Sequence, residues 1–325
     1  MGLFKPNVER LEKNKNVRKL ISALEYKADA TIRKQAASAL GNIRDESAVS
    51  ALETALLAED DPEVRGEIAL ALKSCGYSPD LNEAGARYAA LTGDYEFCAR
   101  CGPGPGIQNL YLAFIGLPDD NTSQYRKWRD AYLQCGPEGF APLVQLFEQY
   151  YGLYKSFVSG IEGLNFSLGS DRKKAAIIKM FSQKICQLTQ TVAQYRDARA
   201  FEFLSQAYRR VVHDIYSHSA GGFLDIFNAV DIRSSIADGM SAFDVKEYGD
   251  NVARFLYGIF LHDECFLVRW HAVQVLDSWP LNVVRSNPLL MKGLQFALEK
   301  VPTAPEHSAT SGYQKSTIRR IMGGK

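Results

Sequence analysis

The sequence lacks the features that mark membrane and secreted proteins. No stretch of its 325 residues approaches the roughly 18 uninterrupted apolar residues that a membrane-spanning helix needs. Residues 1–10, MGLFKPNVER, contain no apolar core of a signal peptide, and Pro6 breaks the pattern for myristoylation. Six cysteines without a secretion signal are typical of free thiols in a reducing compartment. We therefore expect a cytoplasmic protein that has no membrane partner.

An excess of charge of one sign is also missing. The net charge is +1, which argues against a general polyanion binder, so we do not expect nucleic acid as the main partner. The charge is uneven, however. Residues 1–44 hold ten Lys and Arg and four Asp and Glu, whereas residues 45–96 hold three and twelve. Such neighbouring segments can steer a charged partner, or they can be two solvated helix faces.

Strand and phosphate-loop patterns are absent as well. No segment alternates apolar and polar residues over several positions. The glycine-rich stretch 102–106, GPGPG, lacks the Lys-Ser/Thr of a phosphate loop and follows no strand, so we interpret it as a turn. Most apolar residues fall at helical spacing, which predicts an all-α protein.

What is present is a tandem repeat with a fixed period. One copy is residues 61–76, DPEVRGEIALALKSCG. Asp61 can cap a helix, Pro62 suits the first helical position and Gly76 can end the helix. The same pattern begins one period earlier at Asp29, and the preceding helix repeats at the same offset, at 17–24 and 49–56. A fixed period of this kind predicts pairs of helices stacked in a solenoid, with Leu40 and Leu72 buried between them.

An arginine follows the first apolar residue of each repeated helix. Arg33 and Arg65 lie at the edge of the apolar stripe, where the stem can cover apolar surface while the guanidinium reaches an acid of the same or the adjacent repeat. We expect Asp29 and Asp61 to be the favoured partners. Arg269, in LVRWHAVQVLDSW, occupies the equivalent position near the end of the chain.

The stretch from Ile32 to Leu72, IRKQAASALGNIRDESAVSALETALLAEDDPEVRGEIALAL, resembles HEAT repeats, in particular the short phycobilisome-lyase HEAT-like repeats. The V/I-R-x-x-A-x-x-A-L core and the D-x-x-A-V-x-x-L start of the next helix carry this resemblance, which is strongest over residues 16–77. It implies an α-solenoid in which the second helix of each pair lines a concave surface.

The organisation changes along the chain. We expect N-terminal HEAT-like repeats over residues 1–100 and a diverged helical region with longer helices over 101–301, where the repeat pattern returns near 245–280. The middle region is either diverged repeats or an inserted helical subdomain. Residues 302–325 read as a linker and a basic tail, which is either a docked helix or a frayed end.

No catalytic, cofactor-binding or metal-ligating residue is expected. Cys98 and Cys101 form one Cys-x-x-Cys pair, whereas a structural zinc site usually needs two. Helical metal phosphohydrolases use a more tightly spaced set of ligands than the candidates in this chain, which are His213, Asp214, His218, His262 and Asp263. The His-Glu dipeptides of the HEAT-like deoxyhypusine hydroxylases are absent.

These patterns favour a non-catalytic scaffold that binds another protein. Its expected contact residues are exposed positions on the second helices, together with two arginines of YRKWRDAY: Lys34, Gln35, Ser38, Glu63, Glu67, Lys73, Arg126 and Arg129. Two alternatives stay open. One is a solenoid that binds nucleic acid through the interleaved basic and aromatic residues of YRKWRDAY. The other is a bilin-lyase-like or chromophore-handling protein, as the repeat type implies.

Overall fold

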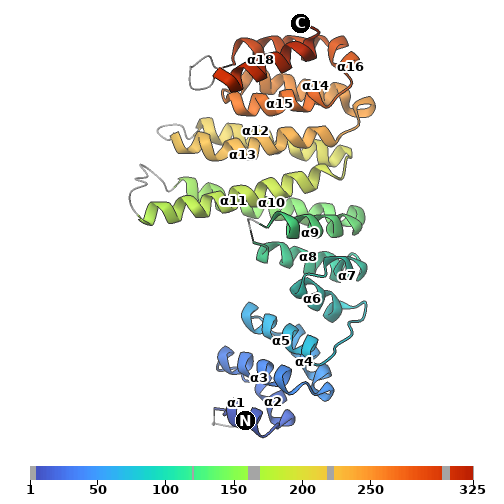
Figure 1. Ribbon diagram of the computed structural model, residues 1–325, viewed down its shortest axis with the longest axis vertical. Coiled ribbons are helices and arrows are strands. Elements are labelled where there is room, and N and C mark those ends of the chain that lie inside the picture. Colours follow the sequence, from blue (N-terminus) through green and yellow to red (C-terminus); the bar gives the residue numbers. More distant parts are fainter. Residues whose placement is uncertain (1–4, 119–120, 160–168, 218–222, 302–307, 325) are drawn as a thin grey trace. The chain divides into compact units, whose positions relative to one another are not determined.

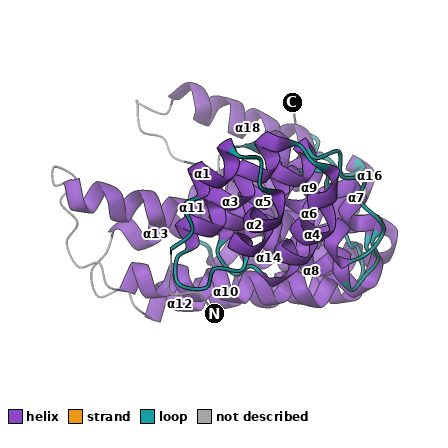
Figure 2. Ribbon diagram, turned by 90° about the horizontal axis from the view of Figure 1, so that it is seen from below, coloured by secondary structure: helices purple, strands orange, loops and turns teal. Residues whose placement is uncertain are grey.

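The computed structural model describes residues 5–118, 121–159, 169–217, 223–301 and 308–324. These residues form helices joined by short loops, and none of them lies in a β-strand (Figure 2). The prediction of an all-α protein is therefore confirmed. Within the same residues, no helix is both long enough and apolar enough to pass through a bilayer.

In chain order, the helices are α1 (Val8–Lys13), α2 (Val17–Leu24), α3 (Ala30–Ile43), α4 (Val49–Ala58), α5 (Pro62–Ser74), α6 (Glu83–Thr92), α7 (Tyr95–Arg100), α8 (Pro105–Gly116), α9 (Thr122–Gln134), α10 (Phe140–Ser159), α11 (Gly169–Ala193), α12 (Ala198–Ser217), α13 (Phe223–Gly239), α14 (Val245–His262), α15 (Phe266–Asp277), α16 (Leu281–Ser286), α17 (Pro288–Glu299) and α18 (Ser308–Met322). Short 3-10 turns precede α4, follow α9 and follow α13.

The chain divides into two compact units, an N-terminal unit of residues 1–142 and a C-terminal unit of residues 143–325. This boundary reflects compactness, and it lies well beyond residue 100, where the sequence places the end of the regular repeats. The division at residues 100 and 301 follows the repeat pattern alone and stays a prediction.

The N-terminal unit is built from pairs of helices stacked in two layers (Figure 1). The first helices of the pairs, α2, α4, α6 and α8, pack against one another in sequence. The second helices form the other layer, in which α3 packs along α5 and α7 packs along α9. Between α5 and α7 there is no comparable contact within the described residues, so the second layer is interrupted at this point.

Local chemistry explains where the repeated helices begin and how closely they approach. Asp61 Oδ1 caps α5 by accepting from the backbone N–H groups of Glu63 and Val64, at 2.9 and 3.1 Å. Leu40 and Leu72 are fully buried, as the repeat alignment predicted. A Cβ on Gly41 would lie 3.0 Å from the Cα of an α5 residue, so this glycine permits α3 and α5 to pack closely.

The arginine at the start of the second helix bonds to the end of the first. Arg65 donates from Nη1 to the carbonyl oxygen of Glu59, the C-cap residue that follows α4, at 3.2 Å. Arg33 likewise donates to the carbonyl of Tyr26, just after α2, at 3.2 Å. The last carbonyls of a helix lack hydrogen-bond partners within the helix and lie at its negative end. A guanidinium at this place donates hydrogen bonds to carbonyl groups and puts a positive charge beside the negative end.

The carboxylate partner is not the one that the sequence indicated. Arg33 forms a bidentate pair with Glu59, Nε to Oε2 at 2.7 Å and Nη2 to Oε1 at 2.9 Å, so an acid of the adjacent repeat is the partner. The expectation that Asp29 and Asp61 would fill this role is wrong. Both aspartates cap helix N-termini instead, and Asp29 also pairs with Lys5 at 3.0 Å.

The C-terminal unit repeats this arrangement. Arg269 donates to the carbonyl oxygen of Asp263, the C-cap residue that follows α14, at 2.6 Å. The Asp263 carboxylate accepts from Arg233 of α13 at 2.6 Å and from the Tyr208 hydroxyl at 2.6 Å. Arg233, Asp263 and Arg269 thus correspond to Arg33, Glu59 and Arg65. Since Arg233 and Asp263 are both buried, this pair is shielded from solvent.

The rest of the C-terminal unit contains the longer helices that the sequence predicted, with 20, 25 and 20 residues in α10, α11 and α12. The basic tail is the docked helix α18, which packs against α15, α16 and α17. Ile318 and Ile321 are buried in this contact, and Arg285 donates to the last carbonyls of α18. Residues 302–307, expected to be a linker, lie outside the described residues.

The stacking predicts different costs for two leucines of α5. Leu72→Ala should lower the free energy of unfolding by about 2–5 kcal/mol, because it leaves a cavity between helices. Leu70→Ala is the matched control, because Leu70 is 57% exposed, and should change it by less than about 0.5 kcal/mol. Urea unfolding followed by circular dichroism measures both values. Equal costs would show that the repeat alignment places the wrong face of α5 inward.

The Arg33–Glu59 pair predicts a loss of stability in acid. The hydrogen bond from Arg33 lowers the pKa of Glu59 below its ordinary 4.5. The pair therefore stabilises the fold above pH 4.5, and this contribution is lost as the pH falls through the folded-state pKa.

Glu59→Gln should lower the free energy of unfolding by about 1.5–3 kcal/mol at pH 7. Below pH 5, the free energy of unfolding should fall less steeply in this variant than in the wild type. Glu63→Gln is the control, since its pair with Lys34 is exposed to solvent and its loss should change the unfolding free energy far less. Urea titrations at several pH values between 7 and 3.5 test this, and the same acid dependence in Glu59→Gln as in the wild type would contradict it.

Candidate functional site

Six of the eight predicted contact residues lie on neighbouring helices of the N-terminal unit. Lys34, Gln35 and Ser38 lie on α3, and Glu63, Glu67 and Lys73 lie on α5. The Lys34 ammonium pairs with the Glu63 carboxylate at 2.8 Å, which links the two helices at the surface. Leu70 falls at helical spacing from Glu63 and Glu67. We call this set the α3–α5 face: Lys34, Gln35, Ser38, Glu63, Glu67, Leu70 and Lys73.

The other two predicted residues are on α9 and do not belong to the α3–α5 face. Arg126 is exposed, whereas Arg129 pairs with Asp130 at 2.7 Å. The aromatic residues beside them are core residues. Trp128 is fully buried and donates from Nε1 to the Leu110 carbonyl at 2.7 Å. YRKWRDAY therefore does not present a stacking platform for bases.

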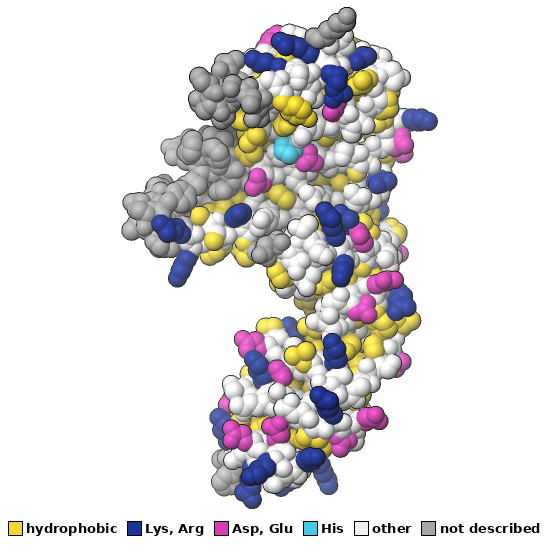
Figure 3. Space-filling view, in the orientation of Figure 1, with side chains coloured by type: hydrophobic (Ala, Val, Ile, Leu, Met, Phe, Trp, Pro, Cys, Tyr) yellow, Lys and Arg dark blue, Asp and Glu magenta, His cyan; other side chains and the backbone are white. Residues whose placement is uncertain are grey.

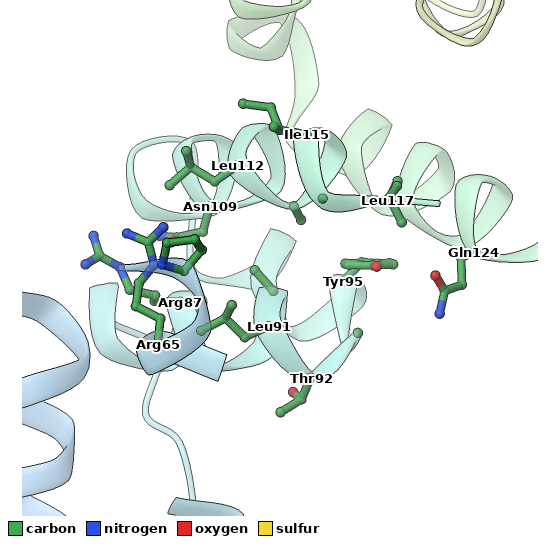
Figure 4. Close-up of a pocket in the computed structure, with 15 residues that line it drawn as sticks. Arg65, Arg87, Leu91, Thr92, Tyr95, Asn109, Leu112, Ile115, Leu117 and Gln124 are labelled. Atoms are coloured by element: carbon green, nitrogen blue, oxygen red, sulfur yellow. The ribbon is translucent and has the colours of Figure 1, made fainter. Parts of the chain in front are cut away.

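A cleft between α6 and α8 was not expected from the sequence (Figure 4). Its volume is about 460 Å³, and its walls are mainly apolar. Leu91, Leu112 and Ile115 contribute large side chains that are 42%, 43% and 49% exposed. Among the described residues, the charged ones that line it are two arginines, Arg65 and Arg87, and no described acid does so. The cleft thus combines an open aliphatic wall with positive charge.

The two arginines lie at one end of the cleft (Figure 4). Arg87 donates from Nη1 to the Leu57 carbonyl at 2.8 Å and pairs with Glu83 at 3.1 Å. Its Nε is buried and finds no hydrogen-bond partner among the described residues. Arg65 and Arg87 both bond to the C-terminal end of α4, so the packing of the repeats holds the two guanidinium groups in place.

One signal in the sequence could have revealed the aliphatic wall. Leu57, Leu91 and Ile115 are the next-to-last residues of α4, α6 and α8, and all three are exposed. A large aliphatic residue at the same exposed position of successive first helices is a pattern. It escapes a search at a single fixed period, because the interval from Leu57 to Leu91 is longer than the interval from Leu91 to Ile115.

The cysteine pair occupies structural positions. Cys98 is buried and donates from Sγ to the Gly106 carbonyl at 3.6 Å, and Cys101 donates to the Phe97 carbonyl at 3.4 Å. Burial raises the pKa of Cys98 to about 12, so its thiol stays protonated at neutral pH.

The histidine candidates are dispersed. His213 is exposed, and the neighbouring Asp214 accepts from Tyr151 at 2.8 Å and pairs with Lys155. His262 lies at the end of α14, and the Asp263 carboxylate forms an ion pair with Arg233. His218 lies outside the described residues. In the part of the chain that the structure describes, no group of three His, Cys, Asp or Glu residues could hold a metal ion.

Comparison with known proteins identifies the repeat. Residues 15–84 match the family model of HEAT repeats, which confirms the resemblance seen in the sequence. This match does not distinguish the phycobilisome-lyase-like variety, which stays a prediction. Among curated proteins, none matches this sequence.

The solved structures that match this chain include natural and designed proteins. An engineered protein is 16% identical, with 95% of this chain and 98% of that one covered and a TM-score of 0.28. Importin beta, crystallised in an ammonium sulfate condition, is 15% identical with a TM-score of 0.35. That match covers 98% of this chain, which spans only 37% of importin beta.

Proposed function

We propose that this chain is a non-catalytic scaffold that binds another protein through the surface of its N-terminal unit. Helical repeats make extended surfaces, because each unit packs on its neighbours and leaves one side of its helices free. The observation that carries the proposal is the α3–α5 face, where Leu70 is 57% exposed among charged side chains of both signs. An apolar side chain within a polar rim is the arrangement found in protein–protein interfaces.

The charge distribution supports a protein partner over nucleic acid. In the view of Figure 3, Lys/Arg and Asp/Glu side chains are interspersed over the N-terminal unit, without a continuous basic stripe. Lys34 and Arg129, which could face phosphates, are paired with Glu63 and Asp130. A polyanion would have to displace these acids, whereas a protein surface of mixed charge would not.

Affinity capture with the tagged full chain in its native cells tests this proposal. Reversing two charges on the α3–α5 face, with Glu63→Lys and Glu67→Lys together, should reduce recovery of a specific partner at least fivefold. The control reverses two charges of the C-terminal unit, Glu202→Lys and Glu299→Lys, and should leave recovery unchanged. Quantitative mass spectrometry reads the result. Partners recovered equally by both variants would contradict the proposed surface.

A further inference from the structure

The cleft between α6 and α8 has walls of two kinds, which together define an occupant. Leu91, Leu112 and Ile115 line it with aliphatic surface, and Arg65 and Arg87 lie together at one end (Figure 4). Its volume of about 460 Å³ is within the range of sites that bind small groups. We propose that this cleft binds a polypeptide segment of a partner protein that carries a leucine-like side chain directly beside a carboxylate.

The requirement for a carboxylate follows from the charges. Within the part of the chain that the structure describes, the charged lining residues are both cationic, and each is anchored to carbonyl groups at the end of α4. Glu83, the acid paired with Arg87, is not among the lining residues. A carboxylate at this end of the cleft would form charge-assisted hydrogen bonds with guanidinium groups that are already held in place.

The requirement for an aliphatic side chain follows from exposure. Leu91 of α6 and Leu112 and Ile115 of α8 are between 42% and 49% exposed, and covering them removes apolar surface from water. The exposure of this aliphatic surface favours a peptide over a fatty acid, since an acyl chain gains most from an enclosed site that covers nearly all of its surface. Polar groups for a peptide backbone are present on the rim, where Thr92 and Gln124 are exposed.

This inference rests on the proposed scaffold function and specifies what one part of the surface recognises. It concerns a different face from the α3–α5 face, because Leu70, Glu63 and Glu67 do not line the cleft. The two surfaces can therefore be altered separately, and failure of one leaves the test of the other intact.

Methyl NMR of the full chain, labelled at Leu and Ile, tests the inference directly. The probes are blocked hexapeptides Gly-Ser-Leu-Asp-Ser-Gly and the variants in which Leu-Asp becomes Leu-Asn, Leu-Lys or Ser-Asp, with decanoate as a separate probe. The Leu-Asp peptide should shift the methyl signals of Leu91, Leu112 and Ile115 in a saturable way. Replacing Leu by Ser should weaken binding about 10–100-fold. Leu-Lys should bind at least tenfold more weakly than Leu-Asp.

Protein variants complete the test. Leu112→Asp should abolish binding of the Leu-Asp peptide, while Leu70→Asp, on the α3–α5 face, should leave it unchanged. Arg65→Gln should lower the affinity for the Leu-Asp peptide several-fold and leave the affinity for the Leu-Asn peptide unchanged. Arg65→Lys should restore most of the lost affinity for the Leu-Asp peptide.

Three outcomes would overturn the inference: no peptide shifting these methyl signals, equal affinity for Leu-Asp and Leu-Lys, or tighter binding of decanoate than of the peptide. If any of these occurs while the Glu63 and Glu67 reversals still reduce partner capture, the scaffold proposal stands and only the cleft assignment fails.

Discussion

The hydrogen bond between an arginine and carbonyl groups at or just after the end of a helix recurs at the junctions of this fold and fixes how its apolar helices meet. It closes the turn of a repeat at Arg33, Arg65 and Arg269, and it joins consecutive repeats where Arg87 reaches the end of α4. Arg285 does the same for the last turn of α18. Each bond satisfies carbonyl groups that the helix itself cannot pair and places positive charge at its negative end. Glu59 and Asp263 add a carboxylate at the same place, which receives an arginine from the preceding repeat.

This constraint links the stability of the N-terminal unit to its surface chemistry. Arg65 and Arg87 have their positions because they close and join repeats, and those positions are also one end of the cleft between α6 and α8. Their charge is held before any ligand arrives, so a partner would not have to order two flexible side chains. In contrast, the α3–α5 face is a mixed-charge surface around a single exposed leucine. The two faces would therefore recognise different features of a partner.

The sequence was sufficient to predict the all-α repeat fold, but it predicted only some of the side-chain contacts. Periodicity placed the caps at Asp29 and Asp61 and the buried Leu40 and Leu72 correctly, because these features depend on a helix and its nearest neighbour. It named the wrong partner for Arg33, because the two aspartates are engaged as N-caps and Glu59 reaches Arg33 across the stack. The cleft could not be predicted from the repeat period, since it arises where α6 and α8 depart from that spacing and where, among the described residues, α5 and α7 make no contact comparable to that of α3 with α5.

The central claim is that exposed apolar side chains of the N-terminal unit are covered by a protein partner. Hydroxyl-radical footprinting of the captured complex, compared with the free chain, reads these side chains individually. The account predicts that oxidation of Leu70 and Leu112 falls several-fold in the complex. It predicts no change at Leu289 of the C-terminal unit, which is 37% exposed and serves as the internal control. Protection of Leu289 with Leu70 and Leu112 unchanged would contradict the account.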